Sequence, residues 1–416
     1  MDRIVGSNPC CRFCKNPLRH TFVDLGMSPL CQTHIEPNQL NQMERFFPLN
    51  VFVCERCFLV QLDEFVAPSD IFSDYAYFSS YSDSWVAHAK RYALAMCDRL
   101  GLGDASLVVE VASNDGYLLQ HFVARGVPVL GIEPAANVAA VAVEKGIRTK
   151  VAFLGVETAR RIARTFGHAD LVVGNNVLAH VPDINDFVGG LKELLGPNGM
   201  ITMEFPHLLQ LMDCNQFDTI YHEHFSYLSF ATVCEIFAAH GLTIMDVEEL
   251  PTHGGSLRIF ARHTGHRDSE MTPAGRNLLE RERARGLRRI ETYFEFTERV
   301  RATKRDILTF LINAKRDGKS IVGYGAPGKG NTLLNYCGIR TDFLDYTVDR
   351  SPHKQGRYTP GTRIPIHAPE RIRETRPDYL FILPWNLTEE IVEQTRYIRE
   401  WGGRWVVPIP QIKVIE

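Results

Sequence analysis

The chain has 416 residues, of which 45% are hydrophobic, 23% charged and 10% aromatic, and this composition excludes disordered and collagen-like chains. Because domains commonly hold about 100 to 150 residues, more than one compact core is expected. The 46 basic and 49 acidic residues leave a formal net charge of -3, so no chain-wide positive field attracts nucleic acid or an anionic membrane, and a small-molecule substrate is favoured.

The first 70 residues hold two Cys-x-x-Cys pairs, Cys11 with Cys14 and Cys54 with Cys57. Such a turn brings two thiolates to one ion at about 2.3 Å, and two turns complete a tetrahedral zinc site with no open position for catalysis. We therefore predict a structural zinc and a zinc-binding domain over 1–70, with free thiols or a redox pair as the alternative. The 39 residues between the pairs exceed the usual ribbon spacing and are expected to form an excursion of their own. Nearby residues that could replace a ligand are Cys10, His20, Cys31 and His34.

Residues 71–104 begin with a stretch rich in Tyr, Ser and Phe and continue into an amphipathic helix expected from about Trp85 to Leu100. Tyr75 and Tyr77 flank one alanine in this stretch and would share a strand face. The two tyrosines are expected either to pack in a core or to cover an active site.

From residue 105 the pattern changes to short runs rich in Val and Ile that alternate with helical periodicity. Such runs, bounded by Gly or Pro, are typical of buried parallel strands joined by crossover helices. A helix is expected over 227–240 and strands over 242–262, so 71–265 is predicted to form one nucleotide-binding α/β domain. One long, charged helical segment is expected over 275–317. A second alternating series follows it and predicts a further α/β domain over 266–416.

The loop after the first predicted strand, VEVASNDGYLL, has an acid, Glu110, at the strand end and a single glycine, Gly116, before the next helix. Glu133 ends the next strand, where ribose hydroxyls are usually bound. One glycine in place of three weakens a dinucleotide interpretation, whereas the ammonium and sulfonium of S-adenosylmethionine (SAM) suit an acidic, polar loop. SAM is therefore favoured over NAD or a structural loop. The residues predicted to bind the cofactor are Glu110, Ala112, Asn114, Asp115, Gly116, Tyr117, Leu118, Glu133, Pro134, Asn175, Asn176 and Val177.

The segment DTIYHEHFSY places Tyr221, His222, Glu223 and His224 in consecutive positions. His is the commonest general base, a neighbouring carboxylate can raise its basicity, and a tyrosine hydroxyl can donate to an oxyanion. Catalysis is the favoured interpretation, with satisfied core groups or a His-x-His metal site as alternatives.

Three residues outside this segment are further candidates. His180 follows a strand of the first α/β series, where a substrate-facing residue is expected. His253 and Arg258 belong to the HGGSLR turn, whose glycines a tight turn explains equally well.

The segment GYGAPGKGNT holds Gly323-x-Gly325-x-x-Gly328 between a predicted strand and a predicted helix. Taken alone it is a dinucleotide fingerprint. Pro327 and Lys329 within the loop suit a turn that binds the diphosphate of a nucleotide-linked substrate equally well. The residues by themselves leave both interpretations open.

These motifs together resemble the sugar C-methyltransferases of deoxysugar pathways, of the type that methylates C-3 of dTDP-4-keto sugars. The resemblance runs through CRFC, CERC, DYAYFSSYS, VEVASNDGYLL, NNVLAHVPD, YHEHFSYLS, HGGSLR and GYGAPGKGNTLLNYCG. It implies an α/β protein with a small N-terminal zinc-binding domain, a central class I SAM-methyltransferase domain and a second Rossmann-like domain at the C-terminal end. It also implies that the C-terminal domain binds the sugar nucleotide, and so favours the diphosphate interpretation of the glycine loop.

The chemistry of such a reaction gives the candidate residues roles. A proton on the carbon beside a ketone can be removed if the enolate is stabilised, so His224 is the hypothetical base for the C-3 proton and Glu223 positions or tunes it. Tyr221 and either Tyr75 or Tyr77 would donate to the developing oxygen charge, and His180 would help to orient the substrate. The residues predicted to bind the dTDP-linked 4-keto-deoxysugar are Tyr221, His222, His253, Arg258, Gly325, Ala326, Pro327, Lys329, Asn331, Asp349, Lys354, Gln355 and Tyr358.

Two rival functions were weighed against methyl transfer. An NAD-dependent nucleotide-sugar oxidoreductase or epimerase would use the GYGAPG loop for a dinucleotide, and a non-catalytic zinc adaptor would have lost its activity. A monomer is expected because no heptad or apolar interface stripe is present. Since no apolar run reaches the roughly 18 residues of a membrane span and no secretion signal is recognised, a protein of the cytoplasm is expected.

Overall fold

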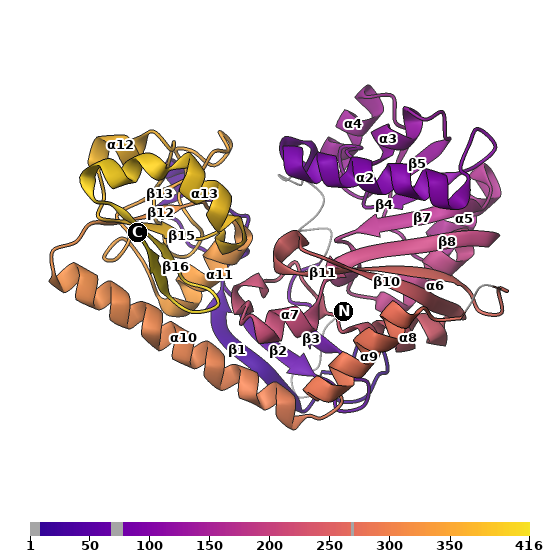
Figure 1. Ribbon diagram of the computed structural model, residues 1–416, viewed down its shortest axis with the longest axis horizontal. Helices are drawn as coiled ribbons and strands as arrows, with labels where there is room; N and C mark the ends of the chain where they lie inside the picture. The colour runs from indigo at the N-terminus through magenta and orange to yellow at the C-terminus, as the bar shows by residue number, and fades with distance from the viewer. Residues whose placement is uncertain (1–8, 68–77, 268–269) are drawn as a thin grey trace. The chain divides into compact units, whose positions relative to one another are not determined.

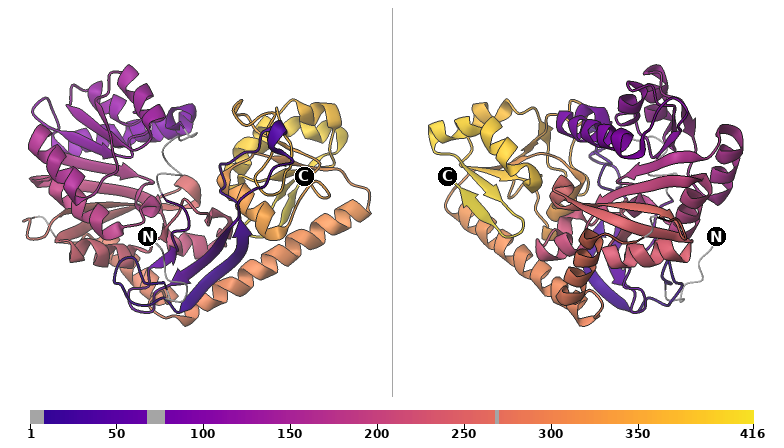
Figure 2. Two further views of the ribbon diagram at one scale, coloured as in Figure 1. Left: turned by 180° about the vertical axis from the view of Figure 1, so that it is seen from behind. Right: turned by 45° about the vertical axis from the view of Figure 1, so that its right-hand side comes forward.

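The computed structural model describes residues 9–67, 78–267 and 270–416. The chain packs into two compact units, each assembled from separate stretches. The first takes the residues up to Arg19, Cys54–His207 and Phe225–Arg288, and the second takes His20–Val53, Leu208–His224 and Arg289–Glu416. The predicted boundaries 1–70, 71–265 and 266–416 stay a prediction, since the units group the same segments differently. Figures 1 and 2 show the elements of each unit.

The first unit is built on a seven-stranded sheet in the order β10-β11-β8-β7-β4-β5-β6. The strands β6, β5, β4, β7 and β8 are parallel, while β11 runs antiparallel to both β8 and β10. These strands are β4 (Val108–Val111), β5 (Val129–Glu133), β6 (Thr149–Val151), β7 (Ala169–Asn175), β8 (Leu195–Pro206), β10 (Leu242–Leu250) and β11 (Ser256–His263). The parallel sheet predicted from the alternating pattern is confirmed.

Helices precede, connect and follow these strands. They are α2 (Asp83–Leu100), α3 (Leu119–Val123), α4 (Ala136–Glu144), α5 (Val156–Phe166), α6 (Ile184–Leu194), α8 (Phe230–Ala239) and α9 (Pro273–Arg285). The unit also contains the antiparallel pair β3 (Val60–Leu62) and β9 (Ser226–Tyr227). Its short 3₁₀ helices are η2 (Ser79–Tyr81), η3 (Leu178–His180) and η5 (Thr252–Gly254).

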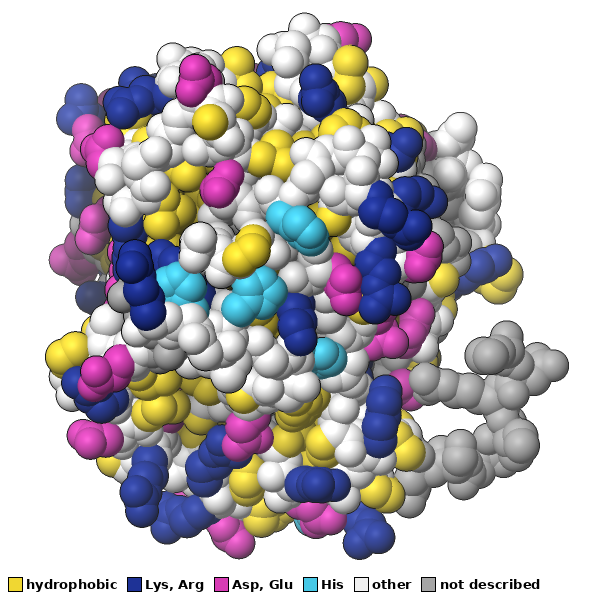
Figure 3. Space-filling view, turned by 90° about the vertical axis from the view of Figure 1, so that its right-hand side faces the viewer, with side chains coloured by type: hydrophobic (Ala, Val, Ile, Leu, Met, Phe, Trp, Pro, Cys, Tyr) yellow, Lys and Arg dark blue, Asp and Glu magenta, His cyan; other side chains and the backbone are white. Residues whose placement is uncertain are grey.

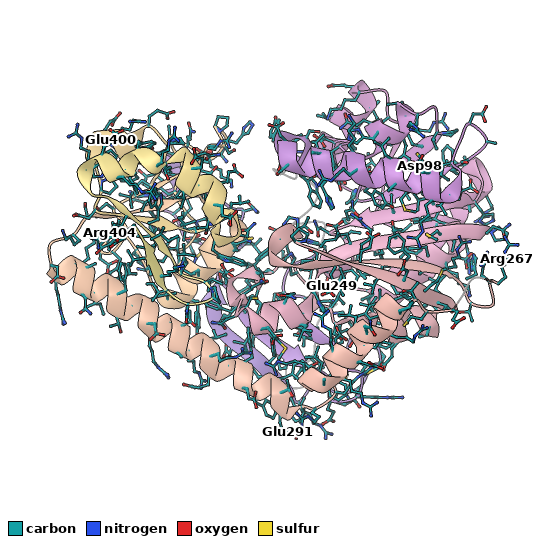
Figure 4. All side chains as sticks on the ribbon, in the orientation of Figure 1. Asp98, Glu249, Arg267, Glu291, Glu400 and Arg404 are labelled. Atoms are coloured by element: carbon teal, nitrogen blue, oxygen red, sulfur yellow. The ribbon has the colours of Figure 1, made fainter. Side chains whose placement is uncertain are left out.

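The sequence of α2 explains its length and its orientation. The Ser82 side chain accepts a hydrogen bond from the Trp85 backbone NH and caps the first turn, and Gly101 ends the helix in the left-handed conformation at φ 63°. The buried side chains follow the i, i+3, i+4, i+7 spacing of one helix face: Ala89, Tyr92, Ala93, Met96 and Cys97. Asp98, labelled in Figure 4, lies on the outer face with 74% of its side chain exposed. The helix predicted from Trp85 to Leu100 is confirmed.

The second unit contains a six-stranded sheet in the order β14-β13-β12-β15-β16-β17, parallel except for β17. The strands are β12 (Ile321–Tyr324), β13 (Thr347–Val348), β14 (Ile366–His367), β15 (Tyr379–Ile382), β16 (Arg404–Val407) and β17 (Lys413–Ile415). The helices are α7 (Leu208–Asp213), α10 (Glu291–Arg316), α11 (Gly328–Cys337), α12 (Arg371–Thr375) and α13 (Thr388–Gln394). The 3₁₀ helices are η1 (Pro37–Gln39), η4 (Phe217–Thr219), η6 (Trp385–Leu387) and η7 (Arg396–Trp401). The second α/β series predicted from the sequence is confirmed.

The predicted excursion between the two cysteine pairs forms an antiparallel pair of strands in this unit, β1 (His20–Ser28) with β2 (Phe47–Val53). Figure 2 shows β1 lying alongside α10. Phe22 of β1 stacks on Phe296 of α10 with ring centroids 4.7 Å apart, and the Thr297 hydroxyl donates to the Phe22 carbonyl at 2.7 Å.

The helical segment expected over 275–317 is two helices rather than one. Gly286 ends α9 at φ 88°, and α10 begins five residues later. The second of these helices, α10, is amphipathic. One face of α10 is buried, and its members recur every three or four residues: Thr292, Tyr293, Phe296, Val300, Thr303, Ile307, Leu311 and Ala314.

Two surface properties follow from the composition. The face of the molecule drawn in Figure 3 mixes basic and acidic side chains, as the nearly balanced charge predicts. Within the part of the chain that is described, no helix combines the length and the apolarity needed to cross a bilayer.

Candidate active site and metal centre

Four cysteine thiols converge in the first unit. The Sγ atoms of Cys11, Cys14, Cys54 and Cys57 all lie within 4.8 Å of one another, with Cys11 to Cys57 and Cys14 to Cys54 each at 3.5 Å. A tetrahedral zinc with bonds of about 2.3 Å separates its sulfurs by about 3.8 Å, so the four thiols fit this ion. The Gln61 side chain adds a donor to the Cys11 Sγ at 3.2 Å, as a thiolate ligand requires. The structure thus brings together the four predicted ligands, and the substitutes considered from sequence are not in the group.

The loop after β4 turns sharply. Ala112, Asn114 and Gly116 have φ values of 57°, 49° and 78°, so three of five consecutive residues are left-handed. A Cβ on Gly116 would lie 2.3 Å from the Ile147 Cδ1, so a side chain there would collide as well as strain the backbone. The loop therefore stays tight and brings backbone groups to the carboxyl end of the sheet.

The polar side chains of this loop are held by residues from other parts of the first unit. The Asn114 Oδ1 accepts the backbone NH of Ser79 at 2.9 Å, and the Asp115 Oδ2 accepts that of Ser80 at 3.3 Å. Lys145 forms an ion pair with Asp115 at 3.3 Å. The residues directly before α2 thus lie against the predicted cofactor loop, which fits a cover over a bound ligand. Tyr75 and Tyr77 lie outside the described residues.

Two buried acids end the neighbouring parallel strands β4 and β5. Burial raises the pKa of Glu110 well above its usual value, and the charges of Glu133 and Asp115 raise it further. Burial also raises the pKa of Glu133, although its carboxylate accepts the backbone NH groups of Ala135 and Asn114, each at 2.9 Å. Because acids crowded in this way disfavour ionisation, a cationic ligand beside them is favoured. The predicted acids and loop are therefore gathered at one sheet edge, and they fit the sulfonium and ribose of SAM.

Aromatic rings line the same region of the first unit. Trp85 stacks near Tyr117 with ring centroids 6.0 Å apart, and lies 5.2 Å from His253. The His253 Nε2 lies 3.0 Å from the Asn176 Nδ2, and the Asn175 Nδ2 donates to the Tyr117 hydroxyl at 3.4 Å. His253, predicted for the substrate, is thus placed among the predicted cofactor residues. Trp85 was missed, although its place in an aromatic stretch directly after the Tyr-rich segment was a signal. The other predicted cofactor residues here are Leu118 and Val177, both buried, and the half-buried Pro134.

A buried ion cluster connects α2 with β8 and β11. The Glu204 Oε2 lies 2.7 Å from the Arg258 Nη2 and 2.9 Å from the His88 Nε2, and its Oε1 accepts the Thr252 hydroxyl at 2.9 Å. Burial by itself would raise the pKa of Glu204, but the hydrogen bond from His88 and the charge of Arg258 outweigh it and lower the pKa. Arg258 also forms an ion pair with Glu248 at 3.0 Å, so its guanidinium is bonded to two carboxylates of the first unit. Its role in substrate binding stays a prediction, and His88 and Glu204 were not foreseen.

We expect Arg258→Met to lower the free energy of unfolding by about 3 to 5 kcal/mol at neutral pH, because it leaves the Glu204 charge buried without its main partner. The stability contributed by Glu204 is present above its unfolded pKa of about 4.3 and is lost as the pH falls through the lowered folded value. The deficit should therefore shrink below about pH 4. Urea unfolding across this pH range measures it, with Glu248→Gln as a control because that side chain is 46% exposed. A wild-type stability for Arg258→Met at pH 7 would contradict the account.

The Tyr-His-Glu-His segment lies in the second unit. The His224 Nδ1 lies 2.8 Å from the Thr219 carbonyl oxygen, which can only accept, so Nδ1 carries a proton, and in the neutral form of the ring the lone pair lies on Nε2. The Tyr221 ring lies 4.1 Å from the His224 ring. The Glu223 carboxylate accepts the Cys31 thiol at 3.3 Å, and both Glu223 and His224 are buried. The tautomer of His224 is therefore the one that a general base requires.

His222 points elsewhere. Its Nε2 lies 3.1 Å from the Pro48 carbonyl and its ring packs near Phe47, so it contacts β2. Burial lowers the pKa of His222, which keeps the ring neutral. A substrate contact for His222 stays a prediction. The His-x-His metal alternative gains no support, because among the described residues the ligand group contains only the four cysteines.

The glycine loop of the second unit is held by side chains predicted for the substrate. Gly325 is left-handed at φ 88°, and a Cβ there would lie 2.7 Å from Pro384. The Asp349 Oδ2 accepts the Ala326 backbone NH at 2.8 Å, the Lys354 ammonium donates to the Ala326 carbonyl at 3.0 Å, and the Gln355 amide donates to the Asp349 carbonyl at 2.9 Å. The structure therefore gives these three side chains a role in holding the loop.

Lys329 is the cation of this loop. Its Nζ donates to the Asn386 Oδ1 at 2.8 Å and lies 4.6 Å from the Trp385 ring centre, and no carboxylate lies within ion-pair distance of it in the described part of the chain. Burial lowers the pKa of Lys329, while the Asp218 charge raises it. The Asp218 Oδ2 in turn accepts the Trp385 indole NH at 2.7 Å. Trp385 and Asp218 were not foreseen from sequence.

The remaining predicted site residues lie in the following elements. Pro327 caps α11 and Asn331 lies in its first turns, while Tyr358 pairs with Ile35 by two backbone hydrogen bonds of 2.9 Å. His180 ends η3 in the first unit, and its backbone NH donates to the Val177 carbonyl. The cofactor residues with His180, His253 and Arg258 thus belong to the first unit, and the Tyr-His-Glu-His segment with the glycine loop belongs to the second.

Comparison with known proteins identifies the chain. Three family models match it: a zinc binding domain over residues 11–72, a methyltransferase domain over 85–247 and a C-methyltransferase C-terminal domain over 251–410. The C-methyltransferase NovU of Streptomyces niveus is 40% identical over 418 residues, covering 100% of this chain and 99% of the relative. Among solved structures, a SAM-dependent methyltransferase of Anabaena variabilis is 17% identical with a TM-score of 0.36, covering 43% of this chain and 86% of that one. The SAM-bound magnesium protoporphyrin IX methyltransferase of Synechocystis gives 16% identity and a TM-score of 0.33, covering 44% of this chain and 82% of that one.

The chain belongs to the C-methyltransferase family. It is a SAM-dependent enzyme of the class I methyltransferase fold, with a zinc-binding domain at its N-terminal end, and its cofactors are SAM and a structural zinc. The predicted family, fold class, enzyme class and cofactors are confirmed. C-methylation thereby displaces both rivals, the NAD-dependent oxidoreductase or epimerase and the non-catalytic adaptor.

Proposed function

We propose that this enzyme transfers a methyl group to C-3 of a dTDP-4-keto-deoxysugar, by proton abstraction and an enolate, in the synthesis of a branched-chain deoxysugar of a natural product. The observation that carries the proposal is the fixed tautomer of His224, whose Nδ1 proton is held by the Thr219 carbonyl at 2.8 Å. An imidazole with its lone pair on Nε2 is a base of suitable strength for a proton made acidic by an adjoining ketone. The relative named a C-methyltransferase supports transfer to carbon.

In this mechanism the His224 Nε2 takes the C-3 proton, and the C–H electron pair moves into the C-3 to C-4 bond while charge develops on the C-4 oxygen. Tyr221, whose ring lies 4.1 Å from that of His224, donates a hydrogen bond from its hydroxyl to this oxygen and keeps its proton. Glu223, which precedes the base in the chain and is buried like it, would favour the imidazolium that forms. The enolate carbon then attacks an electrophilic methyl group, and His224 later releases its proton to solvent.

SAM supplies the methyl group as an electrophile on a sulfonium. The left-handed loop at Gly116 would cradle its amino acid part, and Glu133 its ribose, because both lie at the carboxyl ends of parallel strands. The buried acids Glu110 and Glu133 favour its positive charge. The remaining cofactor assignments, and the orienting role of His180 toward the substrate, are part of the same proposal.

The glycine loop of the second unit would bind the diphosphate. Since the Ala326 NH is used by Asp349, we assign the phosphate contacts to the ammonium of Lys329 and the first turns of α11, where Asn331 lies. Lys329 has no carboxylate partner in the described residues, so its charge is available to an anion. We expect the protein to be a monomer and to lie in the cytoplasm.

The test is a panel of dTDP-4-keto-deoxysugars, with amino or oxygen substituents at C-3, incubated with the enzyme and SAM and followed by mass spectrometry. We expect a gain of one methylene on at least one sugar, and NMR of the product should place the methyl group on C-3. Methylation on oxygen or nitrogen, or conversion that requires NAD, would overturn the proposal. Omission of SAM is the matched control.

A further inference from the structure

A thiol from the N-terminal excursion contacts Glu223, the residue directly before the predicted base, in the second unit. Cys31 follows β1, and its Sγ donates to the Glu223 Oε1 at 3.3 Å. Only 3% of Cys31 and 5% of Glu223 is exposed, so this contact is shielded from water. Of the ten cysteines, four converge as zinc ligands, and among the described residues Cys31 belongs to neither that group nor a disulfide.

The position of Cys31 is set by contacts of the residues that follow it. Downstream, Ile35 exchanges two backbone hydrogen bonds of 2.9 Å with Tyr358, and Glu36 forms an ion pair with Arg357 at 2.8 Å. These contacts tie the excursion to the loop that follows β13. The thiol is therefore presented to Glu223 by a segment that is anchored in the same unit.

The glycine loop makes room for the thiol. A Cβ on Gly328, the first residue of α11, would lie 3.0 Å from the Cys31 Sγ and 3.5 Å from the Gln32 Nε2. Any larger residue at this position would push the thiol away from Glu223. A glycine that a motif search assigns to phosphate binding thus also accommodates Cys31.

A second observation marks this place as one that receives a ligand. Asn331 lies three residues after Gly328 and so shares its face of α11. Its side chain is 4% exposed, and its Nδ2 has no hydrogen-bond partner among the described residues. A buried donor without an acceptor costs free energy unless a ligand supplies one. The carbonyl and phosphate oxygens of a sugar nucleotide are such acceptors.

In this hydrogen bond the Cys31 thiol can only be the donor. Burial raises the pKa of the Cys31 thiol well above its usual value, so it remains protonated and donates. An ionised carboxylate accepts, and a donor on one oxygen restricts rotation of the Glu223 side chain. Glu223 directly precedes His224 and both are buried, so a fixed Glu223 carboxylate would give the imidazole a constant electrostatic field.

We propose that Cys31 is a positioning residue for proton abstraction, holding the Glu223 carboxylate beside His224. This inference rests on the proposed function. It gives the excursion between the zinc-binding cysteine pairs a part in the chemistry of the second unit, beyond its packing on α10.

The test measures exchange of the C-3 proton for deuterium, together with methyl transfer, in the full-length enzyme. For Cys31→Ala and Cys31→Val we expect both rates to fall about tenfold, the size expected for losing a hydrogen bond to a charged group, with the KM of the sugar nucleotide within about twofold. Cys31→Ser keeps a hydroxyl donor and should recover most of the rate. Valine fills the space of the thiol, so it reports on the lost donor if the alanine variant is poorly folded.

Cys337→Ala is the matched control, because it removes another buried thiol of the same unit that lies in α11. Wild-type exchange in both Cys31→Ala and Cys31→Val would overturn the inference, as would an equal loss in Cys337→Ala. Failure of the proposed function is distinguishable, since His224→Asn would then also exchange at the wild-type rate.

Discussion

His224→Asn should lower the rate of methyl transfer by about 10²- to 10⁴-fold, the usual contribution of a general base. The asparagine amide nitrogen occupies nearly the place of the His224 Nδ1, so it can still donate to the Thr219 carbonyl that Nδ1 contacts at 2.8 Å. What the variant lacks is the Nε2 lone pair. The change thus removes the base while preserving the local hydrogen bond, and the loss should appear in kcat rather than in the affinity for either ligand.

Exchange of the C-3 proton separates this role from a role in methyl transfer alone. With S-adenosylhomocysteine in place of SAM, the wild-type enzyme should exchange the proton in deuterated buffer and His224→Asn should not. His353→Asn, on the exposed surface of the same unit, is the control for a histidine change as such. If a folded His224→Asn enzyme that binds SAM exchanged the proton at the wild-type rate, His224 could not be the base.

Cys11→Ser is expected to release the zinc and to destabilise the first unit by several kcal/mol, because structural zinc contributes about 10 to 16 kcal/mol of apparent binding free energy in small zinc domains. We expect the loss of zinc to disturb residues outside the metal site as well. The Arg12 guanidinium donates to the Pro182 carbonyl at 2.9 Å, and the Asn185 amide donates to the Arg12 and Phe13 carbonyls at 3.1 and 3.0 Å. The cysteine turn therefore holds the segment after β7 that follows His180.

The measurements are zinc content and thermal unfolding, each with SAM titration. We expect less than one zinc per chain, a lower melting temperature and weaker SAM binding in Cys11→Ser. Cys10→Ser is a closely matched control, since Cys10 is the preceding residue, is exposed and is not one of the four converging thiols. Full zinc content with a wild-type melting temperature in Cys11→Ser would show that the four thiols are not a structural metal site.

Local patterns in the sequence were sufficient for several features. Two Cys-x-x-Cys turns predicted the metal ligands, because the chemistry of a tetrahedral thiolate site needs only those residues at that spacing. Alternating apolar runs and helical periodicity predicted both parallel sheets, since burial on two faces dictates the composition of such strands. The loop with Glu110 and Gly116 was predicted to bind a cofactor from its place between a strand and a helix, and family membership confirms SAM.

Some local signals were misread. The segment over 275–317 was expected to be one helix, and Gly286 divides it at φ 88°. A glycine within a helical pattern is a known C-cap signal, so this break was detectable.

The sequence by itself thus determined the four thiols of the metal site and the family to which the chain belongs, and it predicted a loop for the cofactor. Only the tertiary structure decided the partners of individual side chains, such as Cys31 with Glu223, Glu204 with Arg258, and Asp349 with the Ala326 NH. The physical reason is how far apart the interacting residues lie along the sequence. Turn, strand and metal patterns arise from residues a few positions apart, whereas these partners are 192, 54 and 23 positions apart and meet only when the chain has packed.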